Sequence, residues 1–588
     1  SECSCGATRS CRHRVATILA YQALQVENSD ATSSSPEADA ASSDRNSSVN
    51  AKLKPVDVTD EMLRERLSKA TFRSALRARD QGYAATVRFA DPPVVLLPTC
   101  TVTFLVPWEL AHARCDCVSG GDCEHVAMAI WAVRHCSESS GEQLVSIGGE
   151  PGQAQEDSVV REFHALANEL VSGGWTGALE GIETRSAPLR AALDKGRRVW
   201  LVDLLDALLA AVGESDDGSA GADALECSRL LAEVSMRCNA RPNPKTPAGH
   251  LYGEGVSGTT KLDHVVLRAI GARYRVTGRT GRLSVFFRER GSTDALVLER
   301  NWTVDDGQVP PPGPEIAKRR LVGTPLSLLA TSNITTRGAA RRPNRVLDVS
   351  SNRLQTSVLR GSGQRLETID DYSELRDRMS QRAPATLGPR IRAWSVVVIA
   401  MGEVESMGYD PGTRTVWGVI ADSHGHTLTL VSEWYPEAPA APALLARALC
   451  EGGVSYICAE ASLRQGRLWL EPLTIGFDAP VAVDLHPECE IPPLPVAAVP
   501  LTRDPLVSVL RDVEEWLGGV ARRGVSHLGP AQRRQAQTLV ARLQEVGFEE
   551  LARDIKKTLE EDQAVQGWND LASRAYLTSY LLARGDGV

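Results

Sequence analysis

Three cysteines and one histidine lie close together between positions 115 and 125. Cys115, Cys117, Cys123 and His125 follow the pattern C-x-C, five residues, then C-x-H. Three thiolates and one imidazole are a ligand set that a tetrahedral structural zinc ion takes. Because four protein ligands leave no coordination position for a substrate, the pattern predicts a zinc ion that supports the fold and does not catalyse a reaction.

The same pattern occurs at the start of the chain. Cys3, Cys5, Cys11 and His13 have the same spacing as the later four residues. A repeated spacing of thiols and imidazole is hard to obtain by chance. We therefore expect two Zn²⁺ ions in all, one bound by each motif.

Each motif needs a turn between its two halves and a support for its last ligand. Residues 119–121, Ser-Gly-Gly, can form the turn in the second motif. Apolar residues then recur at helical spacing after the histidine in both copies, so a helix should carry the last ligand in its first turn. These residues are Val126, Ile130 and Val133 in the second motif and Val15, Ile18 and Leu19 in the first.

This arrangement resembles the SWIM zinc finger family, whose pattern is C-x-C, a variable gap and C-x-H on a unit of two strands and a helix. All four ligand positions match in both copies. Upstream of the second motif, TFRSALRARDQGYAATVRF and CTVTFLVPWELAHARCDC also look like the helix and strands that lead into such a finger. The resemblance covers residues 1–25 and 56–136. It implies a role in binding DNA or proteins, often beside Swi/Snf-type helicases or transposases.

The first motif begins very close to the first residue of the sequence. Ser1 lies two residues before the first ligand, and the sequence has no initiator Met. The strands that should precede the first finger are therefore missing. We expect that the sequence is a fragment or a processed form and that the finger at 1–25 is truncated at its N-terminal side.

Disulfides and ordinary buried thiols are the alternatives for these cysteines. A disulfide scaffold is usually short, rich in cysteine and secreted, whereas 13 cysteines are spread over 588 residues here. Free thiols in C-x-C motifs favour the reducing cytoplasm. The mean hydropathy is −0.18 and no apolar run has the length of a membrane helix, so we expect no membrane partner. Only nine of the 65 basic residues are lysine, which suggests a bacterial genome rich in G and C.

Composition and periodicity divide the chain into several domains, and the fold class we predict is multidomain α+β. Residues 28–50 are rich in Ser, Ala, Asn and Asp without apolar periodicity, which indicates a flexible linker. A similar composition at 137–158 predicts a second connection. The expected parts are a truncated finger at 1–25, a disordered linker at 26–55, a finger module at 56–136, a helical domain at 159–238, a β-rich barrel or sandwich at 260–495 and a C-terminal helical domain at 503–588.

Two basic stretches bear on possible partners. The expected helix at 59–80 carries Arg64, Arg66, Lys69, Arg73, Arg77 and Arg79. Residues 265–365 contain 18 Arg and Lys against seven Asp and Glu, a local balance of +11 in a protein of net charge −9. Such stretches can contact a phosphate backbone, although a solvated face or an acidic protein partner explains them as well.

Signals of catalysis are weak in this sequence. No G-x4-G-K-[ST] phosphate loop is present. Asp422, His424 and His426 could form a small metal site, although such residues at a hairpin turn are more often simply exposed. We therefore predict a non-catalytic zinc protein that acts as a DNA- or protein-binding module. The alternative is a protein–protein adaptor for a partner ATPase or helicase, without direct contact with nucleic acid.

Overall fold

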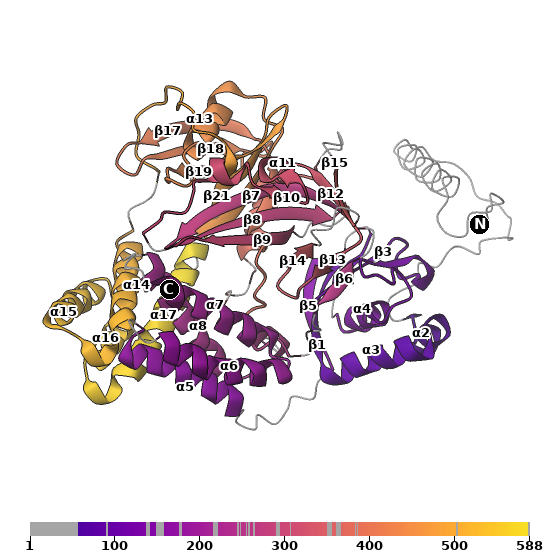
Figure 1. Ribbon diagram of the computed structural model, residues 1–588, viewed down its shortest axis with the longest axis horizontal. Helices are drawn as coiled ribbons and strands as arrows, with labels where there is room; N and C mark the ends of the chain where they lie inside the picture. Colours follow the sequence, from indigo (N-terminus) through magenta and orange to yellow (C-terminus); the bar gives the residue numbers. More distant parts are fainter. Residues whose placement is uncertain are drawn as a thin grey trace, which may run out of the picture. The chain divides into compact units, whose positions relative to one another are not determined.

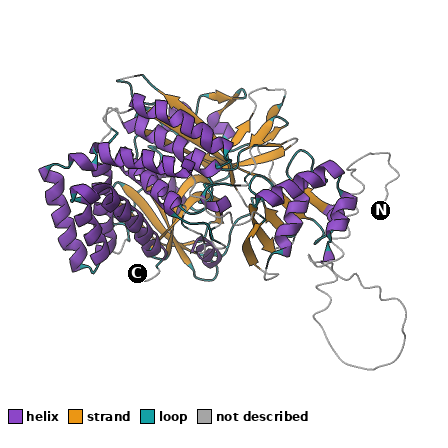
Figure 2. Ribbon diagram, turned by 90° about the horizontal axis from the view of Figure 1, so that it is seen from below, coloured by secondary structure: helices purple, strands orange, loops and turns teal. Residues whose placement is uncertain are grey.

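The structure is a computed structural model that describes residues 57–585 apart from short gaps. The gaps are 90–91, 137–140, 149–157, 176–178, 216–221, 244–245, 247, 255, 257–258, 263–264, 290–294, 306, 350–354, 360–365, 381, 383, 385 and 501–503. As predicted, the chain is a multidomain α+β protein with several sheets and many helices (Figures 1 and 2). The first motif at 1–25 and the expected linker at 26–55 lie outside the described residues.

The first described part combines one antiparallel sheet with three helices. The sheet has the strand order β4-β3-β2-β1-β5. Its elements are α2 (Asp60–Arg66), α3 (Lys69–Gln81), β1 (Tyr83–Phe89), β2 (Val94–Leu96), β3 (Thr101–Phe104), β4 (Ala113–Cys115), α4 (Glu124–Arg134) and β5 (Gly141–Ile147). β5 pairs with β1 over seven residues, so the sheet extends into the stretch 137–158 that was predicted to be only a connection.

Local sequence determines where these elements begin and end. The Thr59 side chain accepts the backbone N–H of Met62 at the start of α2, and Ser68 caps α3 in the same way. Gly82 has a φ of 81°, which ends α3 and lets the chain turn directly into β1. Residues of β1 alternate between buried and half-buried positions, as expected for a strand with one face on the core.

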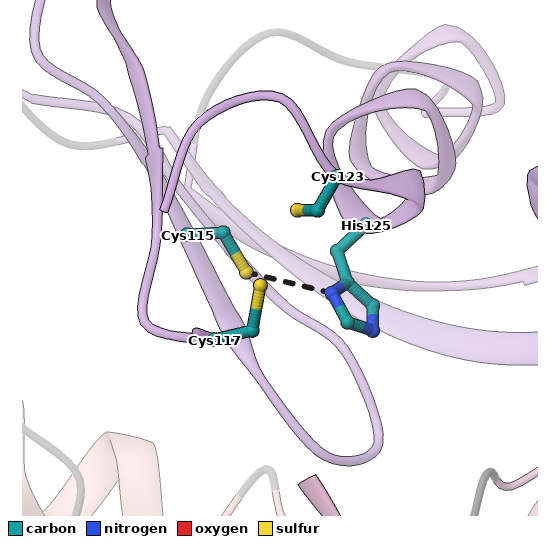
Figure 3. A group of neighbouring side chains, drawn as sticks. All are labelled: Cys115, Cys117, Cys123 and His125. Atoms are coloured by element: carbon teal, nitrogen blue, oxygen red, sulfur yellow. Dashed lines mark hydrogen bonds between the residues drawn. The ribbon is translucent and has the colours of Figure 1, made fainter. Parts of the chain in front are cut away.

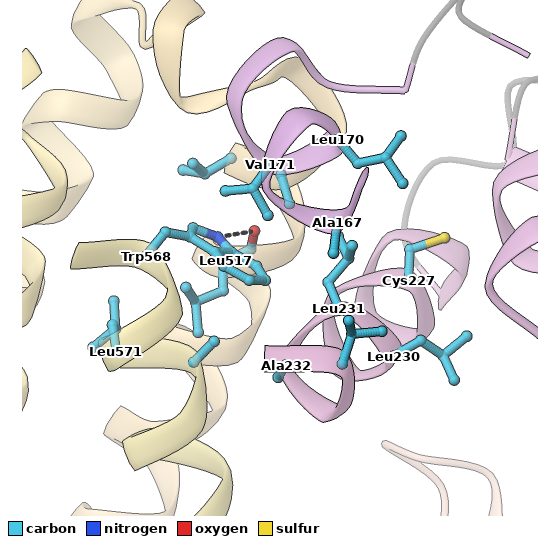
Figure 4. Close-up of a cluster of buried hydrophobic side chains, with 14 of the residues drawn as sticks. Ala167, Leu170, Val171, Cys227, Leu230, Leu231, Ala232, Leu517, Trp568 and Leu571 are labelled. Carbon is cyan, nitrogen blue, oxygen red and sulfur yellow. Dashed lines mark hydrogen bonds between the residues drawn. The ribbon is translucent and has the colours of Figure 1, made fainter. Parts of the chain in front are cut away.

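Helices from two distant parts of the sequence share one hydrophobic core. They are α5 (Ser158–Gly173), α6 (Leu179–Lys195), α7 (Val199–Ser215) and α8 (Ala222–Asn239), together with α14 (Pro505–Arg523), α15 (Pro530–Glu545), α16 (Glu549–Thr558) and α17 (Ala564–Arg584). Figure 4 shows Trp568 of α17 packed between α5 and α14, where its indole Nε1 donates a hydrogen bond to the Leu517 carbonyl at 3.2 Å. The predicted helical stretches at 159–238 and 503–588 therefore form a single core, which the sequence pattern did not indicate.

The middle of the chain contains two larger sheets whose strands interleave in sequence. A five-stranded sheet has the order β15-β12-β7-β8-β9, and a three-stranded sheet has the order β14-β13-β6. Their strands are β6 (Thr260–Leu262), β7 (Val265–Thr277), β8 (Thr280–Glu289), β9 (Ala295–Thr303), β12 (Asn333–Thr336), β13 (Ala339–Arg341), β14 (Leu347–Val349) and β15 (Thr356–Leu359). Short elements lie between β9 and β12, namely α10 (Gly313–Ile316), β10 (Arg320–Leu321), β11 (Thr324–Pro325) and α11 (Leu326–Leu329).

The last sheet closes into a barrel. Its strand order is β16-β20-β21-β19-β18-β17, with β22 paired to β21, and β19 and β21 run parallel. The elements are β16 (Val396–Ala400), β17 (Glu403–Asp410), β18 (Thr415–Ala421), β19 (Thr427–Glu433), α13 (Ala441–Glu451), β20 (Tyr456–Arg464), β21 (Arg467–Gly476) and β22 (Pro480–Ala482). Because β16 and β17 follow each other directly, they form one bent strand that joins the two ends of this order. The result is a five-stranded barrel with a helix between its third and fourth strands.

A glycine at the bend makes this closure possible. A Cβ atom on Gly402 would lie 2.1 Å from the carbonyl oxygen of Ala421 and 2.8 Å from the hydroxyl of Tyr372. Any larger residue would therefore collide with backbone at the point where the bent strand turns.

Within the described residues, we find no helix whose length and apolar character would let it cross a membrane.

Candidate metal centre

Four side chains from β4, the following turn and α4 meet at one end of the first sheet. Cys115 ends β4, Cys117 lies in the turn, Cys123 immediately precedes α4, and His125 belongs to its first turn. Each offers one ligand atom, and these atoms all lie within 4.8 Å of one another. Figure 3 shows the side chains pointing toward a common centre. We call these four residues the knuckle cluster, and such a cluster could bind a metal ion.

The turn that links the two halves of the cluster is held by backbone hydrogen bonds. The N–H of Cys115 donates to the Gly120 carbonyl, and the N–H of Gly120 donates to the Cys117 carbonyl at 3.0 Å. Gly120 has a φ of 73°, a conformation that glycine adopts readily. A Cβ atom on Gly121 would lie 3.0 Å from the Ala113 carbonyl oxygen, so the chain passes close to β4 there. The Ser-Gly-Gly stretch therefore folds back as the sequence predicted.

Helix α4 is fixed by burial along most of its length. Residues from Val126 to Val133 are buried. The Tyr83 hydroxyl on β1 donates to the Met128 carbonyl at 2.7 Å, and the Trp131 indole donates to Asp60 at 2.9 Å. The N-terminus of α4 carries a partial positive charge and lies beside the sulfurs, which favours their thiolate form.

Hydrogen bonds within the knuckle cluster distribute its protons unevenly. Hydrogen bonds from Cys115 and then Cys123 hold the pKa of the Cys117 thiol far below its ordinary value, although burial opposes this. Hydrogen bonds with Cys115 and then Cys117 raise the pKa of the Cys123 thiol. Burial lowers the pKa of His125, but hydrogen bonds to Cys117 and Cys123 outweigh it and bring the value to about 10. Binding of a cation would displace protons from the whole cluster, because thiolates and neutral imidazole are the binding forms.

An arginine from a distant sheet forms a buried ion pair beside the knuckle cluster. Arg341 ends β13, and its guanidinium donates two hydrogen bonds to the carboxylate of Asp116, at 2.6 and 2.8 Å. It also donates from Nε to the Thr99 carbonyl at 2.7 Å. Asp116 lies between the first two cysteines of the cluster and accepts the Thr101 N–H at 2.9 Å. The Arg341 side chain is 1% exposed and that of Asp116 is 8% exposed, so this ion pair is buried.

Sequence reasoning missed two residues of this site. Arg341 lies more than 200 positions from the motif, and no local pattern could connect the two. Cys100 is a fourth thiol that is fully buried, and one ligand atom each of Cys100, Cys115 and Asp116 lie within 4.8 Å of one another. Its place between β2 and β3, directly before Thr101, gave no spacing signal. Cys3, Cys5, Cys11 and His13 lie outside the described residues, so the structure does not place the first cluster.

The barrel region is similar to a known protein family. The model of a family described as the YehQ C-terminal OB-fold domain matches residues 393–504, a stretch that includes the whole five-stranded barrel. OB folds are five-stranded Greek-key barrels.

Over most of its length the chain is similar to Protein YehQ of Escherichia coli (strain K12). The two are 25% identical over 548 residues, which cover 86% of this chain and 85% of that protein. No solved structure matches the chain.

Proposed function

We propose that the knuckle cluster binds Zn²⁺ as a SWIM-type finger and that this finger module serves as a non-catalytic binding module for nucleic acid. The zinc proposal rests on donor type and geometry. With Zn–S of about 2.3 Å and Zn–N of about 2.05 Å, tetrahedral angles place a sulfur and a nitrogen ligand about 3.6 Å apart. The distance from Cys115 Sγ to His125 Nδ1 is 3.6 Å. Three sulfurs and one nitrogen in a largely buried setting suit zinc better than magnesium or calcium, which prefer oxygen.

A row of exposed cations on α3 carries the nucleic-acid proposal. Lys69, Arg73 and Arg77 follow one another at intervals of four residues, which places them on one face of the helix about 6 Å apart. All three are exposed, and none forms an ion pair within the described structure. We call these residues the α3 stripe. Unpaired cations on one face are the feature that neutralises phosphates and releases their counterions.

The other basic residues of this stretch have partners inside the module. Arg66 pairs with Asp122 at 2.9 Å, and Arg79 pairs with Asp60 at 3.5 Å while its guanidinium stacks over Trp131 at 4.5 Å. Arg64 stacks over Phe72 at 5.2 Å. These three support the fold of the module, so the stripe is narrower than the six-residue basic run of the sequence.

The basic stretch at 265–365 supports nucleic-acid binding less well. Some of its arginines are neutralised by carboxylates from other parts of the chain. Arg273 pairs with Glu460 at 2.9 Å, with Glu471 at 3.0 Å and with Asp484 at 3.7 Å, and Arg341 pairs with Asp116. The local balance of +11 therefore overstates the charge that this stretch presents to solvent.

A salt titration with matched variants tests the proposal. Binding of the zinc-loaded chain to a fluorescent DNA duplex would be measured by anisotropy at several salt concentrations. If the α3 stripe contacts three phosphates, replacing all three residues with Gln should reduce the slope of log K against log salt by about 2.7. The control removes three exposed arginines that pair with acids in their own helices, as R376Q/R447Q/R553Q. It should leave the slope nearly unchanged.

Two outcomes would overturn the nucleic-acid proposal. One is the absence of binding to any nucleic acid at low salt, and the other is an equal effect of the two triple variants. Either result would leave the adaptor alternative, in which the module contacts a partner protein such as an ATPase. Zinc binding by the knuckle cluster does not depend on this outcome.

A further inference from the structure

The hairpin between β18 and β19 meets the N-terminus of α12 (Tyr372–Ser380) and brings together two histidines and an aspartate. Asp371, His424 and His426 each offer a ligand atom, and these atoms lie within 4.8 Å of one another. The backbone N–H of Tyr372 donates to Asp422 at 2.8 Å, and the Tyr372 hydroxyl donates to the Ala400 carbonyl at 2.9 Å. The helix start is thereby fixed on the barrel. We call Asp371, His424 and His426 the hairpin triad.

A buried carboxylate organises the hairpin. The Asp422 side chain is 1% exposed. Its Oδ1 accepts the backbone N–H groups of His424 and His426 at 2.8 and 2.9 Å, and its Oδ2 lies 3.2 Å from the Nδ1 of His426. Gly425, with a φ of 83°, allows the tight turn between the two histidines. Asp422 thus fixes the backbone at both histidines and contacts the imidazole of His426.

The contacts of the triad leave ligand atoms available on its exposed side. Nδ1 of His426 lies 3.2 Å from Asp422 Oδ2 and 3.6 Å from Asp371 Oδ1, while Nε2 of that ring has no hydrogen-bond partner in the described part of the chain. A histidine that uses one ring nitrogen for a carboxylate and keeps the other for an ion is typical of metal sites. Oδ1 of Asp371 accepts the N–H groups of Ser373 and Glu374, while its Oδ2 has no partner in the part of the chain that the structure describes. The side chains of His426 and Asp371 are 44% and 42% exposed, so an ion can reach them from solvent.

Electrostatics at the turn favour a cation. The Asp422 carboxylate accepts the backbone N–H groups of Tyr372, His424 and His426, so it lies at the centre of the turn. Together with Asp371, it places two carboxylates beside two imidazoles. These carboxylates would offset the positive charge of a divalent ion.

We propose that the hairpin triad is a second kind of metal site, which binds a divalent transition ion such as Ni²⁺, Cu²⁺ or Zn²⁺ through two imidazoles and one carboxylate. Nitrogen and oxygen donors of this kind suit those ions. Three protein ligands leave coordination positions for water or for a donor atom of another molecule, unlike the four-ligand knuckle cluster. The hairpin triad should therefore bind its ion more weakly and exchange it more readily. This site does not depend on the function proposed for the finger module.

Calorimetric titration of the full chain with Ni²⁺ tests the proposal. The chain is first saturated with zinc at its cysteine sites and freed of excess metal, so that Ni²⁺ reports weaker sites. The wild-type chain should bind Ni²⁺ with one more site per chain than the H424N/H426N variant. Asp371→Asn should weaken that site at least tenfold, because the carboxylate ligand is lost. The control H112N/H527N removes two exposed histidines elsewhere and should behave as the wild type.

Copper spectroscopy separates the site from general histidine binding. The electron paramagnetic resonance spectrum of one equivalent of Cu²⁺ on the zinc-loaded chain should show coupling to two imidazole nitrogens, and this signal should disappear in H424N/H426N. Equal Ni²⁺ stoichiometry in the wild type and in H424N/H426N would overturn the proposal. So would an unchanged copper spectrum in that variant.

Discussion

The buried ion pair between Arg341 and Asp116 gives the sharpest prediction about the knuckle cluster. Arg341→Met keeps most of the volume and the apolar contacts of the side chain but leaves the Asp116 carboxylate buried, with the Thr101 N–H as its remaining donor. Breaking a buried pair by removing one partner costs about 3–5 kcal/mol. Since about 1.4 kcal/mol is a factor of ten, local opening around residues 99–125 should become roughly a hundredfold to a few thousandfold more frequent.

Hydrogen exchange measured by mass spectrometry is the appropriate assay, because peptides covering 99–125 report this region separately from the other domains. Arg342→Met is the matched control, since the neighbouring Arg342 forms an exposed pair with Asp348 at 2.8 Å that is worth at most about 1 kcal/mol. The double variant D116N/R341M should recover most of the lost protection, because no buried charge remains. Wild-type exchange rates in Arg341→Met, or a double variant as unprotected as the single one, would show that this ion pair does not stabilise the region.

Three further predictions concern pH, the barrel and metal removal. Burial and then the Asp116 carboxylate raise the pKa of Glu289 from 4.5 to about 7, so ionisation of Glu289 opposes folding increasingly between pH 4.5 and pH 7 and fully above pH 7. The Glu289→Gln variant should therefore have a higher melting temperature than the wild type at pH 8 and the same melting temperature at pH 5. An equal rise in melting temperature at both pH values would contradict this prediction. The Gly402→Ala variant should have a free energy of unfolding in urea that is at least about 1–3 kcal/mol lower, because the added Cβ would lie 2.1 Å from the Ala421 carbonyl oxygen. The control Gly412→Ala, on an exposed turn, should lower the free energy of unfolding by less. A chelator should expose peptides from 99–136 to hydrogen exchange before those of α14 to α17, and simultaneous exposure would contradict the zinc proposal.

The knuckle cluster could be predicted from sequence because its ligands are local. Cys115, Cys117, Cys123 and His125 lie at the end of one strand, in the following turn and at the start of one helix, so their spacing alone determines that they meet. Arg341 could not be predicted, because its contact with Asp116 depends on how a distant strand packs. The same limit applies to the charge of 265–365, since the carboxylates that neutralise Arg273 come from 460–484.

The type of most elements followed from periodicity, but their assembly did not. Helical stretches around 159–238 and 503–588 show apolar periodicity, yet nothing in either stretch indicates that Trp568 packs against α5 and α14. The barrel order depends on a parallel pair, β19 with β21, and on one strand bent at Gly402. β5 was missed because its composition is that of a loop and Leu144 is half exposed.

Metal analysis of matched cysteine variants shows directly whether the knuckle cluster binds zinc. The purified full chain, the variant C117S/C123S and the control C450S/C489S, which removes two exposed cysteines outside the cluster, would be compared for zinc per chain by mass spectrometry. If the knuckle cluster binds zinc, C117S/C123S should contain one zinc ion fewer per chain than the wild type, and the control should lose none. Equal zinc content in all three proteins would contradict it.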